Sequence, residues 1–218
     1  MPKLEIKQRP LLTRPESFQD VPSFIAEILA RRGVESQQEL ELKLKYLLAP
    51  SMKGLPEAIQ LIDAAIDAGQ KIVIVGDYDA DGATSTALML LALRDMGADV
   101  NYLVPDRFKY GYGLTPAIAD LAFASFTPDL LITVDNGISS HDGVKQAQDH
   151  GMQVIITDHH LTTKPTPAAE AVVNPNQLGC EFPSKALAGV GVAFYVLANL
   201  STHRKKLGKS STVITNYL

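Results

Sequence analysis

An apolar segment that ends in a cluster of carboxylates constrains this chain more than any other feature. Residues 72–75 are four consecutive aliphatic residues, which is typical of a strand buried on both faces. Asp77, Asp79 and Asp81 follow at a spacing of two, so an extended backbone would point all three to one side, with neighbours roughly 6–7 Å apart. Residues 83–94 have the composition of a buried helix. The carboxylates are therefore expected at the carboxyl end of a strand, where open α/β sheets usually bind ligands.

A metal site is one of several interpretations of this cluster. The spacing matches the first half of an EF-hand calcium loop, but the required bidentate Glu would fall at Leu88, and a strand precedes the loop where a helix should. Haloacid-dehalogenase-like phosphatases have a similar pattern, but with Thr or Val where this chain has Asp81. A solvated acidic turn remains an alternative, since Asp and Gly favour turns for local reasons. Three adjacent carboxylates repel one another without a cation, which favours the metal site.

Composition sets the broad class of the protein. The 218 residues are 46% hydrophobic and 20% charged, with no run of eighteen apolar residues and no signal-peptide pattern. We therefore expect a soluble, cytoplasmic chain without a membrane partner. The single Cys180 excludes an internal disulfide and a cysteine metal cluster. The net charge of −4 excludes a broad basic surface, so a phosphate-bearing substrate would need metal ions and a few local cations.

The first 55 residues predict a unit distinct from the rest of the chain. After a proline-containing arm, residues 21–32 and 37–48 both place apolar residues at helical spacing, and Ser36 is a suitable N-cap for the second helix. We therefore predict an arm and a helical hairpin over residues 1–55, followed by a main domain over residues 56–218.

Strands and helices alternate along the predicted main domain. The helices are expected at residues 57–68, 83–96, 116–125, 140–150 and 187–200. The strands are expected at residues 72–75, 99–104, 130–134, 153–156 and 171–173. This alternation predicts an α/β fold with a doubly wound parallel sheet flanked by helices, preceded by the helical N-terminal extension. The basic segment 203–209 is interpreted as solvated surface.

Three of the predicted strands end in acidic or imidazole side chains. These are Asp77, Asp79 and Asp81 after the first strand, Asp135 after the third, and Asp158, His159 and His160 after the fourth. Because the carboxyl ends of parallel strands lie at one edge of a sheet, we expect these side chains to converge. Oxygen ligands with one or two imidazoles favour Mn²⁺ or Mg²⁺, whereas zinc usually takes fewer carboxylates.

A second group of functional side chains lies in the predicted loop 105–113. Arg107 and Lys109 could bind a phosphate, while Tyr110 and Tyr112 could stack against a base. Ordinary surface packing is the alternative for this loop.

Four stretches together resemble a known family. They are Gly-Asp-Tyr-Asp-Ala-Asp-Gly-Ala-Thr-Ser at 76–85, Val-Asp-Asn-Gly-Ile-Ser at 134–139, Thr-Asp-His-His at 157–160 and Ser-Lys-Ala-Leu-Ala-Gly-Val-Gly-Val-Ala-Phe at 184–194. From about residue 20 onward, the chain resembles the DHH phosphoesterase superfamily and, within it, the RecJ-type exonucleases specific for single-stranded DNA. The resemblance implies removal of nucleotides from a 5′ end by a two-metal mechanism, a role in DNA repair and recombination, and partners such as a helicase or a single-strand-binding protein.

The resemblance also implies roles for individual residues. Asp79 and Asp81 are expected to bind metal, Asp135 to bridge two metal ions, and His159 to be a ligand. Asp77 is expected to bind metal directly or to support a ligand. The expected catalytic residues are His160, which would stabilise or protonate the reacting phosphate, and Asp158. A similar Arg-Phe…Gly-Tyr-Gly loop in the RecJ-type proteins favours a substrate role for Arg107.

The chain departs from the wider superfamily in one ligand. Pyrophosphatase members have a His four residues before the second Asp of the first motif, and this chain has Val75 there. Their ligand set therefore cannot be transferred whole. Two other function classes stay open: a phosphoesterase for pyrophosphate, cyclic dinucleotides or short oligonucleotides, and a non-catalytic binding module.

The resemblance finally implies that more sequence would follow in a complete protein. A fourth metal-binding Asp and further domains are expected beyond the basic segment. We therefore expect the main domain to be truncated, with weak or no processive activity. The edge after Val173 and the helix 187–200 are expected to be partly unsupported.

Overall fold

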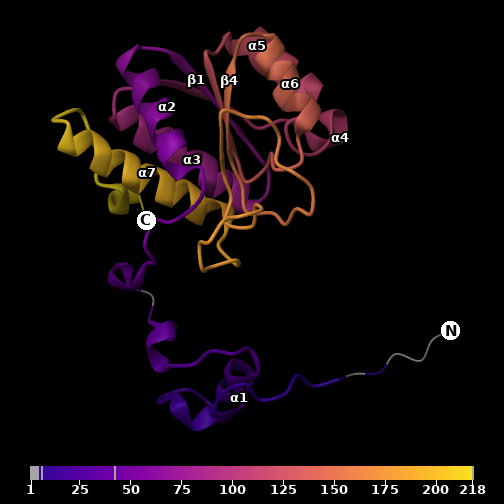
Figure 1. The fold of residues 1–218 in the computed structure, drawn as a ribbon, viewed down its shortest axis with the longest axis vertical. Coiled ribbons are helices and arrows are strands. Elements are labelled where there is room, and N and C mark those ends of the chain that lie inside the picture. Colours follow the sequence, from indigo (N-terminus) through magenta and orange to yellow (C-terminus); the bar gives the residue numbers. More distant parts are fainter. Residues whose placement is uncertain (1–4, 6, 42, 218) are drawn as a thin grey trace. The chain divides into compact units, whose positions relative to one another are not determined.

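The predicted alternation of strands and helices produces a five-stranded sheet in the computed structural model, which describes residues 5, 7–41 and 43–217 (Figure 1). The strands are β1 Lys71–Gly76, β2 Asp99–Leu103, β3 Leu130–Val134, β4 Gln153–Thr157 and β5 Ala171–Val173. Their order is β2-β1-β3-β4-β5, and every pair is parallel. The chain runs outward from β1 to β2 and then crosses back to β3. The strand order therefore reverses between β1 and β3, where sheets of this kind bind ligands.

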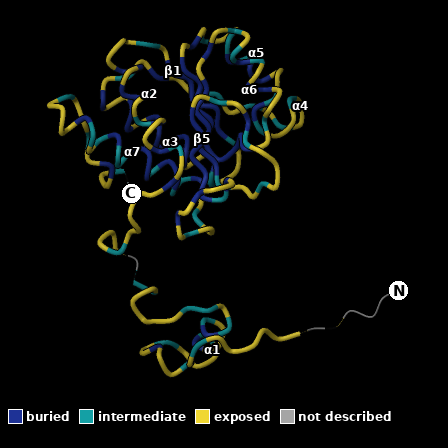
Figure 2. The backbone as a smooth tube through the Cα atoms, viewed as in Figure 1, coloured by how far each residue is buried: buried dark blue, intermediate teal, exposed yellow. Residues whose placement is uncertain are grey.

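Helices cover both faces of this sheet. They are α2 Leu55–Asp67, α3 Ala80–Asp95, α4 Arg107–Tyr110, α5 Pro116–Phe126, α6 His141–Asp149 and α7 Gly189–Lys206. Ile72 and Ile74 of β1 face a core shared with α2, α3 and α7, while Val73 and Val75 face a second core shared with α5 and α6. The strands are accordingly buried throughout the centre of this unit (Figure 2). The predicted doubly wound α/β fold is confirmed.

Residues 1–49 form a separate unit from residues 50–218. The first helix of the predicted hairpin is confirmed as α1 Ser23–Arg31. The second, predicted over residues 37–48, is wrong: the described residues there form the 3₁₀ segments η2 Gln37–Leu40 and η3 Leu44–Tyr46. Neither segment contains a buried residue. An amphipathic helix gains most of its stability by burying its apolar face, so the periodicity alone was insufficient.

The main unit extends slightly further toward the N-terminus than the predicted boundary. The division between the units falls between Ala49 and Pro50, whereas the predicted domain began at residue 56. Helix α2 begins at Leu55, and the segment before it belongs to the main unit. In the part of the chain that the structure describes, we find no helix with the length and apolarity needed to cross a membrane.

Helix α7 and strand β5 are packed against the same unit on part of their surface. Val196 of α7 is fully buried in the core that α7 shares with α2 and α3. At the outer strand, Gln177 Nε2 donates a hydrogen bond to the Val172 carbonyl over 2.7 Å. Strand β5 is the outermost strand of the sheet and Phe194 of α7 is only half-buried, so the expected partial lack of support over residues 187–200 and beyond Val173 stays a prediction.

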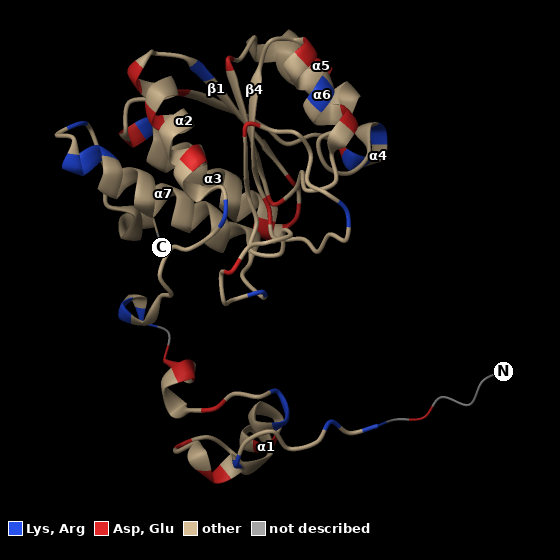
Figure 3. Cartoon of the chain, in the orientation of Figure 1, with Lys and Arg blue, Asp and Glu red and all other residues tan. Residues whose placement is uncertain are grey.

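The basic residues at the end of α7, blue in Figure 3, differ in their exposure. Arg204 is 4% exposed, and its guanidinium lies 2.5 Å from Asp63 Oδ1 and 3.1 Å from Asp67 Oδ1, both on α2. Lys209 Nζ lies 2.6 Å from Asp63 Oδ2. The solvated-surface interpretation is thus wrong for Arg204, since this side chain ties α7 to α2.

Candidate metal centre

The acidic segment after β1 turns into a helix sooner than predicted. Asp79 is the N-cap of α3, and its Oδ1 accepts a hydrogen bond from Gly82 N over 2.9 Å. Asp81 therefore lies in the first turn of α3, and the expected extended arrangement of the three carboxylates is wrong because a local cap replaces it. Gly82 is required here, since a Cβ would lie 2.4 Å from the carbonyl oxygen of Asp77.

Asp135 follows β3 in an unusual conformation. Its φ is 61°, in the left-handed region that Asp tolerates better than most residues. Its side chain is 2% exposed, and Oδ1 accepts no hydrogen bond from any residue that the structure describes. Backbone strain combined with a buried carboxylate oxygen that accepts no hydrogen bond is typical of a functional position.

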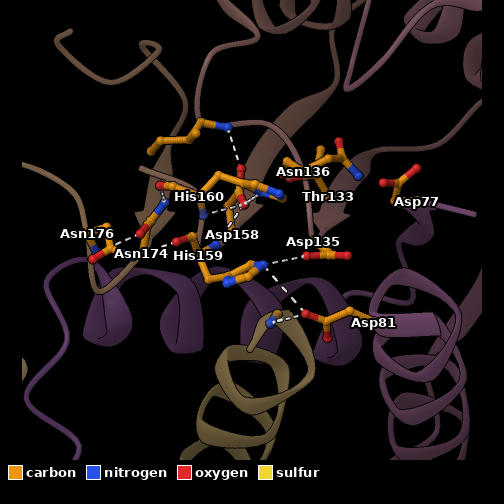
Figure 4. A network of polar contacts seen from close by, with 12 residues as sticks. Asp77, Asp81, Thr133, Asp135, Asn136, Asp158, His159, His160, Asn174 and Asn176 are labelled. Atoms are coloured by element: carbon orange, nitrogen blue, oxygen red, sulfur yellow. Dashed lines mark hydrogen bonds and ion pairs between the residues drawn. The ribbon is translucent and has the colours of Figure 1, made fainter. Parts of the chain in front are cut away.

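The acidic and imidazole side chains converge as predicted (Figure 4). Asp77, Asp79 and Asp135 each offer an oxygen within 4.8 Å of the others, and Asp135, His159 and His160 form a second such group. Asp135 therefore belongs to both groups.

Asp81 reaches the cluster through His159. The His159 Nε2 atom lies 3.1 Å from Asp135 Oδ1 and 3.5 Å from Asp81 Oδ2. One imidazole nitrogen thus contacts both carboxylates, although they come from different strand ends. This places the three side chains around a common point.

The carboxylates of the cluster repel one another. Burial, followed by the charges of Asp81 and Asp79, raises the pKa of Asp135 to about 7. Burial also raises the pKa of Asp77, against the lowering effect of Arg107. A cation between these carboxylates would offset their repulsion. Asp135 Oδ1, which accepts no hydrogen bond, offers such a cation a ligand. The donor set therefore fits an ion that prefers oxygen with some imidazole.

Asp158 is buried beside the cluster and holds His160. Its side chain is 1% exposed; Oδ1 lies 2.7 Å from His160 Nδ1, and Oδ2 accepts a hydrogen bond from Ile138 N over 2.8 Å. Burial acts to raise the pKa of Asp158, but the hydrogen bonds from His160 and Ile138 outweigh it and keep that pKa below its usual value. The same contact raises the pKa of His160. Asp158 thus orients this imidazole and favours its protonated form.

Two of the four predicted substrate residues lie at the cluster. The Arg107 guanidinium is 3.9 Å from the ring centre of Tyr78 and 5.3 Å from that of Tyr112, and one of its nitrogens is 3.6 Å from Asp77 Oδ2. The Tyr112 hydroxyl is 3.2 Å from His160 Nε2. Burial, followed by the charge of Asp158, raises the pKa of Tyr112, so its hydroxyl keeps its proton.

Lys109 and Tyr110 lie further from the carboxylates. The Lys109 ammonium is 4.9 Å from the ring centre of Tyr110, which packs partly against the core beneath α5. Among the described residues, no ion pair or hydrogen bond joins either of them to the acidic cluster. Their predicted substrate role is not tested by this geometry.

Sequence reasoning missed two asparagines that support the imidazoles. Asn174 Nδ2 donates to the His160 carbonyl over 3.1 Å, and Asn176 Nδ2 donates to the His159 carbonyl over 2.5 Å (Figure 4). Both follow β5, so the carboxyl end of a fourth strand also reaches the site. That position in the sheet was the available signal, since the strand itself was predicted.

Two further residues at the site were also missed. Asn136 Nδ2 donates to the carbonyls of Val75 and Val134, over 3.0 and 2.9 Å, and so links the ends of β1 and β3. Tyr78 lies between two of the predicted metal ligands in sequence and stacks on Arg107. Neither has a titratable group that would have drawn attention to it near neutral pH.

A parallel α/β sheet with an acidic, metal-binding type of site at its carboxyl edge is also what comparison with known families finds. Residues 71–217, more than half of the chain, match the model described as DHH family, N-terminal domain. The chain belongs to the DHH family.

The similar curated proteins are single-stranded-DNA-specific exonucleases named RecJ. The protein from Escherichia coli (strain K12) is 46% identical over 208 residues, which cover 94% of this chain and 36% of that protein. The protein from Haemophilus influenzae is 50% identical over 179 residues, which cover 81% of this chain and 31% of that protein. The chain thus spans about a third of the length of these relatives.

Solved structures of RecJ share the fold. The Mn²⁺ complex from Thermus thermophilus has a TM-score of 0.66 at 33% identity, covering 87% of this chain and 26% of that chain. Another RecJ structure, bound to manganese, has a TM-score of 0.65 at 37% identity, covering 75% of this chain and 40% of that chain.

Proposed function

We propose that this chain forms the metal-dependent site of a phosphodiesterase that removes nucleotides from the 5′ end of single-stranded DNA. The observation that carries the proposal is Asp135, a strained and buried carboxylate that belongs to two groups of potential ligands and whose Oδ1 accepts no hydrogen bond from the described residues. The RecJ proteins to which the chain is similar are named exonucleases specific for single-stranded DNA, which supports this substrate.

The donor set supports two positions for Mn²⁺ or Mg²⁺ that share Asp135. Asp77 and Asp79 would complete the first position, and Asp81 and His159 the second. Solved RecJ structures are named as Mn²⁺ and Mg²⁺ complexes, which supports these metals. Two such cations polarise a phosphate, lower the pKa of a bound water and stabilise a leaving oxygen.

His160 is the proposed general acid or hydrogen-bond donor toward the reacting phosphate. Asp158 holds its Nδ1, so Nε2 is the atom directed toward the loop that carries Tyr112. A pocket lined by Tyr112, Ser139 and His160 opens at this point. A phosphate oxygen that entered the pocket would replace the Tyr112 hydroxyl as the partner of Nε2, and Asp158 would keep the imidazole protonated.

Arg107 is the proposed phosphate-binding cation of the loop, with Tyr112 and Tyr78 available for stacking. Its guanidinium already lies beside Asp77 and against the two rings, so a phosphate near the first cation position would be within its reach. Lys109 and Tyr110 would act further along the strand. A cytoplasmic location stays a prediction from the composition. A role in DNA repair and helicase or single-strand-binding partners stay predictions of the resemblance.

Digestion of labelled DNA tests the proposal. Single strands labelled at the 5′ or the 3′ end are incubated with the chain and Mn²⁺, and the Asp135→Asn variant is the control. Label release from the 5′ end first, lost in the variant, supports the proposal. Release that is equal in the variant contradicts it. Activity confined to the shortest strands of a length series would instead indicate a small-substrate phosphoesterase, and a longer version of the protein tests the predicted weakness of this chain.

A further inference from the structure

The first turn of α7 is held by a carboxylate of the candidate metal centre. The backbone N–H of Gly189 donates to Asp81 Oδ2 and that of Val190 donates to Asp81 Oδ1, each over 2.7 Å (Figure 4). Ala188, the N-cap residue, has no side-chain group that could accept these hydrogen bonds. Asp81 therefore caps α7 from another helix.

The first turn of α7 also lies directly against Asp135, the carboxylate that belongs to both groups of potential ligands. A Cβ at Gly189 would lie 2.6 Å from Asp135 Oδ1 and 2.9 Å from both Cβ and Cγ of Asp135. All three of these nearest atoms belong to Asp135. The φ of Gly189 lies outside the left-handed region, so the requirement for glycine here comes from space alone.

Asp135 cannot yield by a backbone shift without losing other contacts. Its own N–H donates to the Thr157 carbonyl over 3.0 Å, which ties the end of β3 to β4. A methyl group at position 189 would therefore rotate the Asp135 side chain or push α7 away. The first response moves the shared ligand, and the second breaks the two hydrogen bonds to Asp81.

We propose that Gly189 is a positioning residue of the metal centre: it admits the N-terminus of α7 to direct contact with Asp135 and so fixes the carboxylates of Asp135 and Asp81 around the second cation position. This inference rests on the proposed function for its metal. It adds a residue that binds no metal itself and acts through the two carboxylates.

Gly191 provides a matched control on the same helix. A Cβ there would meet only the side chain of Leu187, at 2.5 Å and beyond, among its nearest contacts. The end of a leucine side chain can move, whereas the Asp135 contacts include Cβ. Alanine also favours the helix at both positions, so any general gain in helix stability is the same for the two variants.

Calorimetric titration with Mn²⁺ is the first test. We expect Gly189→Ala to weaken the affinity by about tenfold or more, the usual effect of disturbing the support of a metal ligand. Gly191→Ala should bind as the wild type does. Wild-type affinity in Gly189→Ala would overturn the inference, whereas a wild-type chain that binds no Mn²⁺ would instead overturn the proposed function.

Thermal unfolding in EDTA tests the contact without any metal. Gly189→Ala should lower the melting temperature of the wild type. It should not lower that of Asp135→Gly, because removal of the Asp135 side chain vacates the space that the new methyl group needs. Equal lowering in both backgrounds would show that Gly189 does not act through Asp135.

Discussion

Asp135 combines a left-handed backbone, nearly complete burial and a raised pKa in one residue. Each feature is unfavourable in a protein without a compensating partner, and the partner that fits all three is a cation at Oδ1. The neighbouring Asp158 shows the contrast. It is equally buried, but its hydrogen bonds stabilise the ionised form and leave no need for a metal.

The pKa of Asp135 predicts how the stability of the metal-free protein changes with pH. The folded state binds the Asp135 proton up to about pH 7, whereas the unfolded state releases it near the usual value of 3.8. The Asp135 proton therefore stabilises the folded state at low pH, and this stabilisation is lost as the pH rises from about 4 to about 7. Asp135→Asn should remove this pH-dependent decrease in the free energy of unfolding, which is on the order of a few kcal/mol.

Denaturant unfolding in EDTA between pH 5 and pH 8 measures this effect. The wild type should become less stable relative to Asp135→Asn as the pH rises. Parallel stability curves for the two proteins would contradict the raised pKa. Asn is the appropriate replacement because it keeps the shape and tolerates the left-handed backbone.

Asn176 is predicted to matter for metal affinity although it lies outside the ligand set. Its amide holds the His159 carbonyl, so Asn176→Ala should weaken Mn²⁺ binding roughly 10–100-fold, as the loss of other supports of metal ligands does. Asn199→Ala removes a similar amide-to-carbonyl hydrogen bond within α7 and is the control. Equal affinity in the two variants would assign Asn176 a purely structural role.

The sequence predicted the ionisable part of the site better than its supports. Asp77 and Asp135 follow a strand directly and His159 lies two residues after one, so topology alone brings them together once the strands are known to be parallel. Asn174 and Asn176 carry no charge, and their hydrogen bonds go to backbone carbonyls that no sequence pattern marks. Arg107 was found from its loop, but its stacking on Tyr78 depends on where that loop folds.

At the scale of elements, α7 links the metal centre to a distant ion-pair network. Its first turn contacts Asp81 and Asp135, and its last turn carries Arg204, which is buried against Asp63 and Asp67 of α2. The sequence predicted this helix but ended it at residue 200 and interpreted the basic segment as surface. The acidic partners on α2 lie well over a hundred residues earlier in the chain, so charge patterning near residue 204 could not indicate them.

Arg204→Ala is predicted to destabilise the main unit by on the order of 3 kcal/mol, because it leaves Asp63 with fewer partners at a site that is 7% exposed. Unfolding by denaturant measures the loss, and Lys205→Ala, at the neighbouring exposed position, is the control. Because the network lies at the opposite end of α7 from Gly189, Mn²⁺ affinity should stay unchanged below the unfolding transition. A loss of stability of the same size in Lys205→Ala would show that the effect comes from the general charge of the helix.

At the scale of the whole molecule, the described chain has a separate core in each unit. Phe18, Ala26 and Ala30 form the core of residues 1–49, while the two cores that flank the sheet lie entirely within residues 50–218. The sequence could predict two units, because the helical spacing stops before the linker. It could not predict that the described residues between 37 and 48 form 3₁₀ segments where an α-helix was expected, since this depends on whether a surface is available to bury the apolar face.

Removal of residues 1–49 tests the independence of the main unit. We expect residues 50–218 to unfold cooperatively near the midpoint of the main transition of the whole chain and to bind Mn²⁺ equally well, since both cores and every proposed ligand are retained. Differential scanning calorimetry checks the first point and a Mn²⁺ titration the second. Loss of cooperative unfolding would show that the main unit depends on the N-terminal one.

A Mn²⁺ titration of the whole chain at pH 8 shows whether Asp135 is shared between two cation positions. We expect the wild type to take up Mn²⁺ and Asp135→Asn to lose uptake at both positions. Asp120→Asn, at an exposed aspartate of α5, should bind as the wild type does. Uptake by Asp135→Asn equal to that of the wild type would show that Asp135 is not the shared ligand.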